Sequence, residues 1–108
     1  NVDLQNQILG EHLTEPKAAV WFEQGGEPID IRAGVVLDKR TRMIYDLKYI
    51  FINGESYRAA GGDARLMRSL ANKRCIDAKT MKKASEEARS LLVGWCEAGW
   101  AHGIAVKA

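Results

Sequence analysis

The sequence predicts an α+β fold, and three observations lead to it. Short runs of β-branched and aromatic residues fill the stretch from residue 35 to residue 57, a helical period of 3.6 follows from Asp63, and a weak alternation returns at residues 100–106. Strands, two closely joined helices and a closing strand are the layout of a small winged-helix-like domain. A chain of 108 residues, of which 46% are hydrophobic and 28% charged, suits one such domain.

The N-terminal segment predicts an amphipathic helix that precedes the domain. Its apolar residues recur at roughly helical spacing, and Pro16 favours a helix end near Thr14 because the residue before a proline avoids the α region. A helix this short is not stable alone in water, so we expect its apolar residues to contact a partner surface, together with two neighbouring aromatic residues. The candidate interface residues are Leu4, Ile8, Leu9, Leu13, Trp21 and Phe22.

A connector is expected after these aromatic residues. Glycine, proline and charged residues interrupt any period at residues 23–28, so we expect a helical appendage and connector over residues 1–27 and a winged-helix-like domain over residues 28–108. A turn or short helix at residues 28–33 is expected to lead into strands at 35–37, 43–45, 49–52 and 55–57. Asn53 and Gly54 predict a structural hairpin turn of type I′, since both residues tolerate positive φ.

Two helices are expected after the strands. Asp63 is expected to cap the first helix, which would end at Cys75 and Ile76, and Asp77 is expected to cap the second. The second helix carries an apolar stripe at Met81, Ala84, Ala88, Leu91, Leu92 and Trp95, and Gly99 is expected just beyond its C-terminus. Cys75 and Cys96 are isolated, so we expect two buried or half-buried free thiols rather than a disulfide or a zinc site.

Basic residues are concentrated in the helical part of the chain. Residues 58–89 hold nine Lys or Arg against four Asp or Glu, whereas residues 1–57 hold six against nine. A nucleic acid would be attracted to such a stretch, and the candidate basic patch is Arg65, Arg68, Lys73, Arg74, Lys79, Lys82 and Lys83. Acidic residues alternate with these and no aromatic residue lies among them, so a solvated helix surface is favoured. The alternative is a free-standing winged-helix module that binds nucleic acid.

No grouping of polar residues predicts a catalytic centre. Asp38, Asp46 and Glu55 are scattered over expected strand ends without a nucleophile and base, and His12 and His102 stand alone. We therefore expect no catalytic, cofactor-binding or metal-binding residue in this chain. No apolar run approaches the roughly 20 residues that span a bilayer, so we expect a cytoplasmic protein without a membrane partner. The chain begins at Asn1 without a signal-peptide pattern, and we expect this start to be an internal boundary of a longer protein.

Several segments, taken in order, resemble one protein family. They are Leu9-Gly10-Glu11-His12-Leu13-Thr14-Glu15-Pro16-Lys17 followed by Val20-Trp21-Phe22, then Phe51-Ile52-Asn53-Gly54-Glu55, then Leu91-Leu92 through Trp95 to Gly99-Trp100. This order resembles the C-terminal portion of the bacterial cupin-like JmjC proteins, which are the ribosomal oxygenases. The resemblance implies an N-terminal JmjC cupin domain, a helical dimerisation region and a C-terminal winged-helix domain in the full-length protein.

The resemblance also implies a function for that full-length protein, namely hydroxylation of an arginine side chain of a ribosomal protein with Fe(II) and 2-oxoglutarate. The family holds iron with a His-x-Asp…His pattern, but His12 and His102 do not begin a His-x-Asp or His-x-Glu motif, so the resemblance transfers no iron ligand or 2-oxoglutarate contact to this chain. A non-catalytic accessory role is therefore expected, in dimerisation, domain bracing or presentation of the protein substrate. The implied partners are the protein's own cupin domain, a second copy in a homodimer and the ribosomal protein; nucleic acid is not expected.

Overall fold

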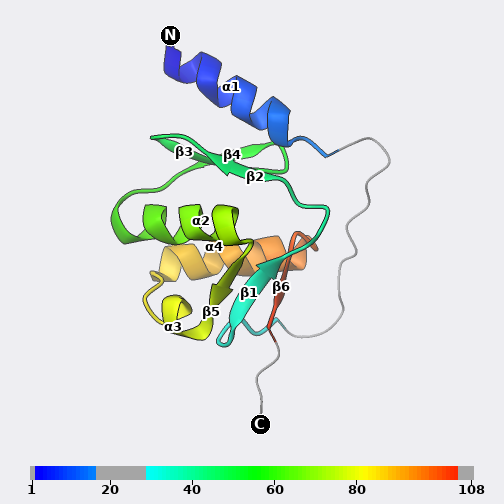
Figure 1. Ribbon diagram of the computed structural model, residues 1–108, viewed down its shortest axis with the longest axis vertical. Helices are drawn as coiled ribbons and strands as arrows, with labels where there is room; N and C mark the ends of the chain where they lie inside the picture. Colours follow the sequence, from blue (N-terminus) through cyan, green and yellow to red (C-terminus); the bar gives the residue numbers. More distant parts are fainter. Residues whose placement is uncertain (1, 17–28, 105–108) are drawn as a thin grey trace.

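The computed structural model describes residues 2–16 and 29–104. Its elements, in chain order, are α1 (Val2–Thr14), β1 (Gly34–Leu37), β2 (Met43–Tyr45), β3 (Tyr49–Ile52), β4 (Glu55–Arg58), α2 (Gly61–Lys73), β5 (Cys75–Asp77), α3 (Ala78–Met81), α4 (Glu86–Glu97) and β6 (Ala101–Gly103). Figure 1 shows α1 on one side of the strands β2, β3 and β4, with α2 and α4 on the other side. The mixed helices and small sheets confirm the expected α+β class. None of the helices described here has the length and apolar character needed to cross a membrane.

The strands form two antiparallel sheets of three strands each, β5-β1-β6 and β2-β3-β4. In the first sheet Val35 pairs with Ile76 on one side and with Gly103 on the other. In the second, β3 and β4 meet at the turn of Asn53 and Gly54, whose φ angles are 47° and 89°. Positive φ at both positions is the geometry of a type I′ turn, which confirms the expected hairpin.

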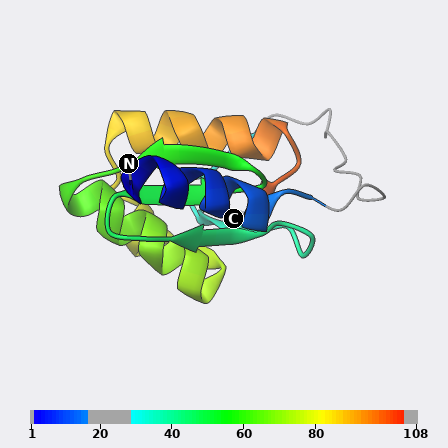
Figure 2. The same cartoon turned by 90° about the horizontal axis from the view of Figure 1, so that it is seen from above.

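The hydrophobic core extends from the second sheet through the helices α2 and α4 to the first sheet. Ile50 and Ile52 on β3 belong to it, together with Leu70 of α2 and Leu92 of α4. Phe51 lies between the two isoleucines on the strand, and successive side chains of a strand point to opposite faces of the sheet. Its ring is buried and packs against α1, which covers that other face in the view of Figure 2.

The expected start of the first domain helix is wrong. α2 begins at Gly61, and its N-cap residue is Ala60, whose side chain makes no capping hydrogen bond. Asp63 lies instead inside the first turn, where its carboxylate accepts a hydrogen bond from Ser85 Oγ at 2.7 Å. An acidic residue in the first turn still stabilises the helix through its dipole, so Asp63 marks the helix start without capping it.

The second expected helix is two helices. Asp77 caps α3 as expected, since its carboxylate accepts a hydrogen bond from the Thr80 amide at 2.7 Å, but α3 ends at Met81. The chain then restarts as α4 after Ser85, whose hydroxyl accepts from the Ala88 amide. The apolar stripe runs through both helices, and the period alone does not show that a serine cap interrupts them. Gly99, with φ 82°, follows the C-cap of α4 as expected.

A short strand, β5, lies where the sequence predicts only the end of a helix. Arg74 closes α2 in a left-handed conformation with φ 65°, and Cys75–Asp77 then pair with β1. The burial of β5 alternates, so Ile76 is buried and Cys75 is exposed, which corrects the expectation that both thiols are buried or half-buried. Cys96 is buried, and burial raises the pKa of its thiol to about 11.

Candidate functional site

The face of α1 that lies on the sheet is polar. Gln7 Nε2 donates a hydrogen bond to Ser56 Oγ at 2.8 Å, and Ser56 Oγ donates in turn to the carboxylate of Glu11. One turn further on, the amide of Gly54 donates to Thr14 Oγ1 at 2.9 Å, and the side chain of Thr14 is fully buried. Hydrogen bonds to β4 and to the hairpin turn therefore fix the position of α1.

Gly10 of α1 lies very close to the ring of Phe51 on the sheet. A Cβ atom at residue 10 would lie 2.5 Å from the ring of Phe51, which is only 2% exposed. Glycine inside a helix is about 0.5–1 kcal/mol less stable than alanine. Gly10 is explained by the contact, because any side chain there would have to move the buried ring or the helix itself.

The apolar residues of α1 point away from the sheet. Leu4, Ile8, Leu9 and Leu13 have exposed fractions of 55%, 57%, 54% and 54%, and we call these four residues the outer surface of α1. They form two i, i+4 pairs, Leu4 with Ile8 and Leu9 with Leu13. Trp21 and Phe22, the other two candidate interface residues, lie outside the described residues. An apolar surface of this kind is typical of contact sites with other protein surfaces.

The residues of the candidate basic patch differ in their surroundings. Five of them, Arg65, Lys73, Lys79, Lys82 and Lys83, are exposed. Arg68 is half-buried, with its guanidinium 5.6 Å from the centre of the Tyr45 ring. Arg74 donates hydrogen bonds to the carbonyl oxygens of Asp38 and Thr41 at 2.8 and 2.9 Å. Its guanidinium therefore ties the end of α2 to the chain after β1.

Asp38 is a buried carboxylate that joins β1 to the last strand. Arg40 Nε donates to it at 2.9 Å, and His102 Nε2 of β6 donates at 2.8 Å. The hydrogen bonds from Arg40, the largest influence, and from His102 hold the pKa of Asp38 well below its usual range, although burial alone would raise it. This cluster fixes His102 in a structural role.

Replacing Asp38 by asparagine is expected to lower the free energy of unfolding at pH 7 by about 2 kcal/mol, because charge-assisted hydrogen bonds are lost. The folded-state pKa of Asp38 lies below its unfolded value, so its stabilisation is present above a pH of about 4 and is lost as the pH falls through the folded pKa. Urea denaturation at pH 7 and pH 3 measures this. The free energies of unfolding of wild type and Asp38→Asn should differ less at pH 3 than at pH 7. An equal difference at the two pH values would contradict the lowered pKa of Asp38 in the folded chain.

The other polar residues considered for catalysis have structural partners. Asp46 accepts hydrogen bonds from the amides of Lys48 and Tyr49, and Glu55 accepts from the hydroxyl of Tyr57. Within residues 2–16 and 29–104, no three His, Cys, Asp or Glu side chains come together in a way that could hold a metal ion. The donor groups of this part of the chain therefore do not fit the two-histidine, one-carboxylate site that non-haem Fe(II) requires.

Comparisons with known proteins place these features in a family. Residues 1–102 match the ROXA-like winged-helix family. No curated protein sequence matches the chain.

Solved structures of YcfD, a ribosomal oxygenase from Escherichia coli, have a similar fold. One superposes with a TM-score of 0.77 at 14% identity and covers 92% of this chain and 30% of that chain. An X-ray structure of the same protein gives 0.70 at 15% identity, with coverages of 93% and 31%. The structure of YcfD in complex with cobalt and 2-oxoglutarate gives a TM-score of 0.70 at 16% identity, and the match covers 93% of this chain and 32% of that chain. The chain thus spans about a third of the length of these structures.

Proposed function

Because the chain belongs to the ROXA-like winged-helix family, we propose that it is the winged-helix part of a longer ribosomal oxygenase and has an accessory, non-catalytic role in it. In this proposal a cupin domain outside the chain would hold Fe(II) and 2-oxoglutarate and would hydroxylate an arginine side chain of a ribosomal protein in the cytoplasm. Dioxygen would be the oxidant, with one oxygen atom entering the arginine side chain and the other entering succinate as 2-oxoglutarate loses CO₂. The coverage of the matching structures supports the proposal, because they are about three times as long as this chain.

The single observation that carries the accessory role is the orientation of α1. A helix that only completed the fold would bury its apolar side chains, but α1 is seated by Gln7, Gly10 and Thr14 and leaves its leucines and isoleucine outside. We infer that residues 1–27 act as an appendage that connects the winged-helix domain, residues 28–108, with the remainder of the protein. The outer surface of α1 is then a contact surface for that remainder.

The occupant that we propose for the outer surface of α1 is the same region of a second copy. The two i, i+4 apolar pairs of the outer surface of α1 would pack against the same helix of the second copy, antiparallel to it across a two-fold axis. One helix pair buries less than the ~1,200 Å² of a stable interface, so further helices of the longer protein would complete the dimer. The winged-helix domain would in this way be held beside the catalytic domain, where it can brace that domain or help to present the substrate.

Replacing Leu9 by aspartate is expected to weaken self-association of the longer protein at least about tenfold, because a charge would be placed in an apolar contact. The fold of residues 35–104 should change little, since Leu9 is 54% exposed. Sedimentation velocity over a concentration series measures the association. Gly62→Asp is the control, because it adds the same charge where a side chain has open space. Unchanged sedimentation of Leu9→Asp would contradict the proposal.

A further inference from the structure

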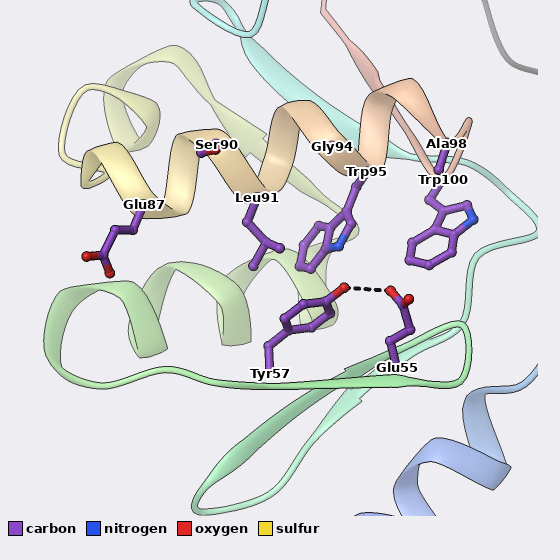
Figure 3. A pocket seen from close by; sticks show the side chains of 9 residues that line it. All are labelled: Glu55, Tyr57, Glu87, Ser90, Leu91, Gly94, Trp95, Ala98 and Trp100. Atoms are coloured by element: carbon purple, nitrogen blue, oxygen red, sulfur yellow. Dashed lines mark hydrogen bonds between the residues drawn. The ribbon is translucent and has the colours of Figure 1, made fainter.

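A groove with a volume of about 650 Å³ lies between β4 and α4. Figure 3 shows its side chains, with Glu55 and Tyr57 rising from β4 towards Leu91 and Trp95 of α4. A second hollow of about 480 Å³ continues along α4 and shares Tyr57, Glu87, Leu91 and Trp95 with the first. The two together form one elongated site that the accessory function described above does not use.

The floor of the groove is aromatic. The rings of Tyr57 and Trp95 meet edge to face, with their centres 5.7 Å apart and an angle of 64° between them. Trp95 is 3% exposed, and its buried indole N–H interacts with the Tyr57 hydroxyl, although the contact falls short of full hydrogen-bond geometry. In Figure 3 the indole nitrogen is on the side of the ring that faces the Tyr57 hydroxyl and Glu55.

Acidic side chains flank this floor. Glu87 and Glu55 lie at opposite ends of the groove in Figure 3, and Asp63 lines the second hollow. Arg58 also lines the second hollow, but its guanidinium lies over the ring of Tyr49, 5.8 Å from the ring centre. Carboxylates attract cations by charge, and the half-buried ring of Tyr57 beside them can add a cation–π interaction. The same carboxylates repel phosphate, which disfavours a nucleic acid here.

Tyr57 and Glu55 are already coupled in the free chain. The Tyr57 hydroxyl donates a hydrogen bond to Glu55 Oε2 at 2.5 Å. Burial, and then the Glu55 carboxylate, raise the pKa of Tyr57, whereas the indole of Trp95 lowers it; the hydroxyl therefore remains a donor at neutral pH. This bond holds the Glu55 carboxylate at the end of the groove and leaves its second oxygen for a bound group.

We propose that the groove between β4 and α4 binds a basic peptide segment, with a cationic side chain of the peptide between Glu55 and Glu87 and against Tyr57. A guanidinium group suits the site better than an ammonium group, because its plane can stack on an aromatic ring while its N–H groups reach a carboxylate. This inference stands on the groove alone and does not require the proposed function.

The test uses the 108-residue chain, labelled with ¹⁵N, and the blocked peptide acetyl-(Gly-Arg)₄-amide at low ionic strength. Saturable shifts of the Trp95 indole resonance and of the amides of residues 55–57 and 91 are expected. Because the interaction is largely electrostatic, the affinity should fall as salt is added. The peptide with citrulline in place of arginine has nearly the same shape without the charge and should bind at least tenfold more weakly. Equal binding of the two peptides would overturn the proposal.

Substitutions of single glutamates test whether the peptide binds in this groove. Glu87→Gln and Glu55→Gln are each expected to weaken the arginine peptide about three- to tenfold. Glu86→Gln is the matched control, because Glu86 is the exposed neighbour of Glu87 on α4 and does not line the groove. The ¹⁵N spectra of all three variants show whether the fold is kept. If Glu86→Gln weakened peptide binding as much as the groove variants do, binding would depend only on the overall charge of the chain, and the proposal would be overturned. A random DNA duplex that shifted the same resonances would overturn it as well.

Discussion

Replacing Gly10 by alanine is expected to destabilise the chain by about 2 kcal/mol, although alanine is the better helix former. The new methyl group would lie 2.5 Å from the ring of Phe51, and that ring is 2% exposed and in contact with Tyr49. The ring cannot move freely, so α1 would be pushed away from the sheet. The hydrogen bonds from Gln7 to Ser56 and from the Gly54 amide to Thr14 would be weakened with it.

Hydrogen exchange and urea denaturation measure this effect. The Gly54 amide should lose protection in Gly10→Ala, because its acceptor is on α1. Gly94→Ala is the matched control: it also replaces a helical glycine, but its Cβ meets no atom within 4 Å, so it should stabilise the chain by about 0.5–1 kcal/mol. If both alanines stabilised the chain equally, α1 would not lie on the sheet as described.

Replacing Leu92 by alanine is expected to lower the free energy of unfolding by about 3 kcal/mol, which is a large fraction of the ~5–15 kcal/mol of a small domain. Leu92 is fully buried in the core between α4 and the sheet, so its removal loses apolar contacts and leaves a cavity. Urea denaturation monitored by circular dichroism measures the change.

The matched control for this variant is Leu13→Ala. Leu13 is also a helical leucine, but it is 54% exposed on the outer surface of α1, and its truncation should cost less than about 1 kcal/mol. Comparable losses in the two variants would mean that the outer surface of α1 is covered within the chain itself. That result would remove the main support for a docking role.

The sequence predicts the hairpin turn and the cap of α3 because one or two residues determine each of them. Asn53 and Gly54 can take positive φ where most residues cannot, and Asp77 caps α3 through its own side chain. It does not predict β5, because three residues are too few to show a period and the strand depends on pairing with β1, about 40 residues away. Nor does it predict the break at Ser85, since an apolar stripe can continue across two helices.

In the candidate site, too, the sequence predicts local patterns but not the contacts between residues that are far apart in the chain. Spacing alone gives the apolar residues of α1, but it does not show which face of the helix meets the sheet. Gly10 has no side chain to contribute to a hydrophobic pattern, and Thr14 contributes a hydroxyl whose partner, the amide of residue 54, is 40 positions away. The sequence does not predict the groove between β4 and α4 either, because Glu55 and Glu87 are far apart in the sequence and line one groove only in the folded chain.

The central claim, that this winged-helix domain is the accessory part of a longer ribosomal oxygenase, is tested most directly by the mass of the native protein. An antibody raised against the chain would isolate that protein from its source, and mass spectrometry with peptide sequencing would read the region before residue 1. We expect about three times the 12.0 kDa of this chain, in keeping with its coverage of the matching structures, and a His-x-Asp…His pattern in the preceding region. A native protein of 12.0 kDa would contradict the claim and leave a free-standing winged-helix domain.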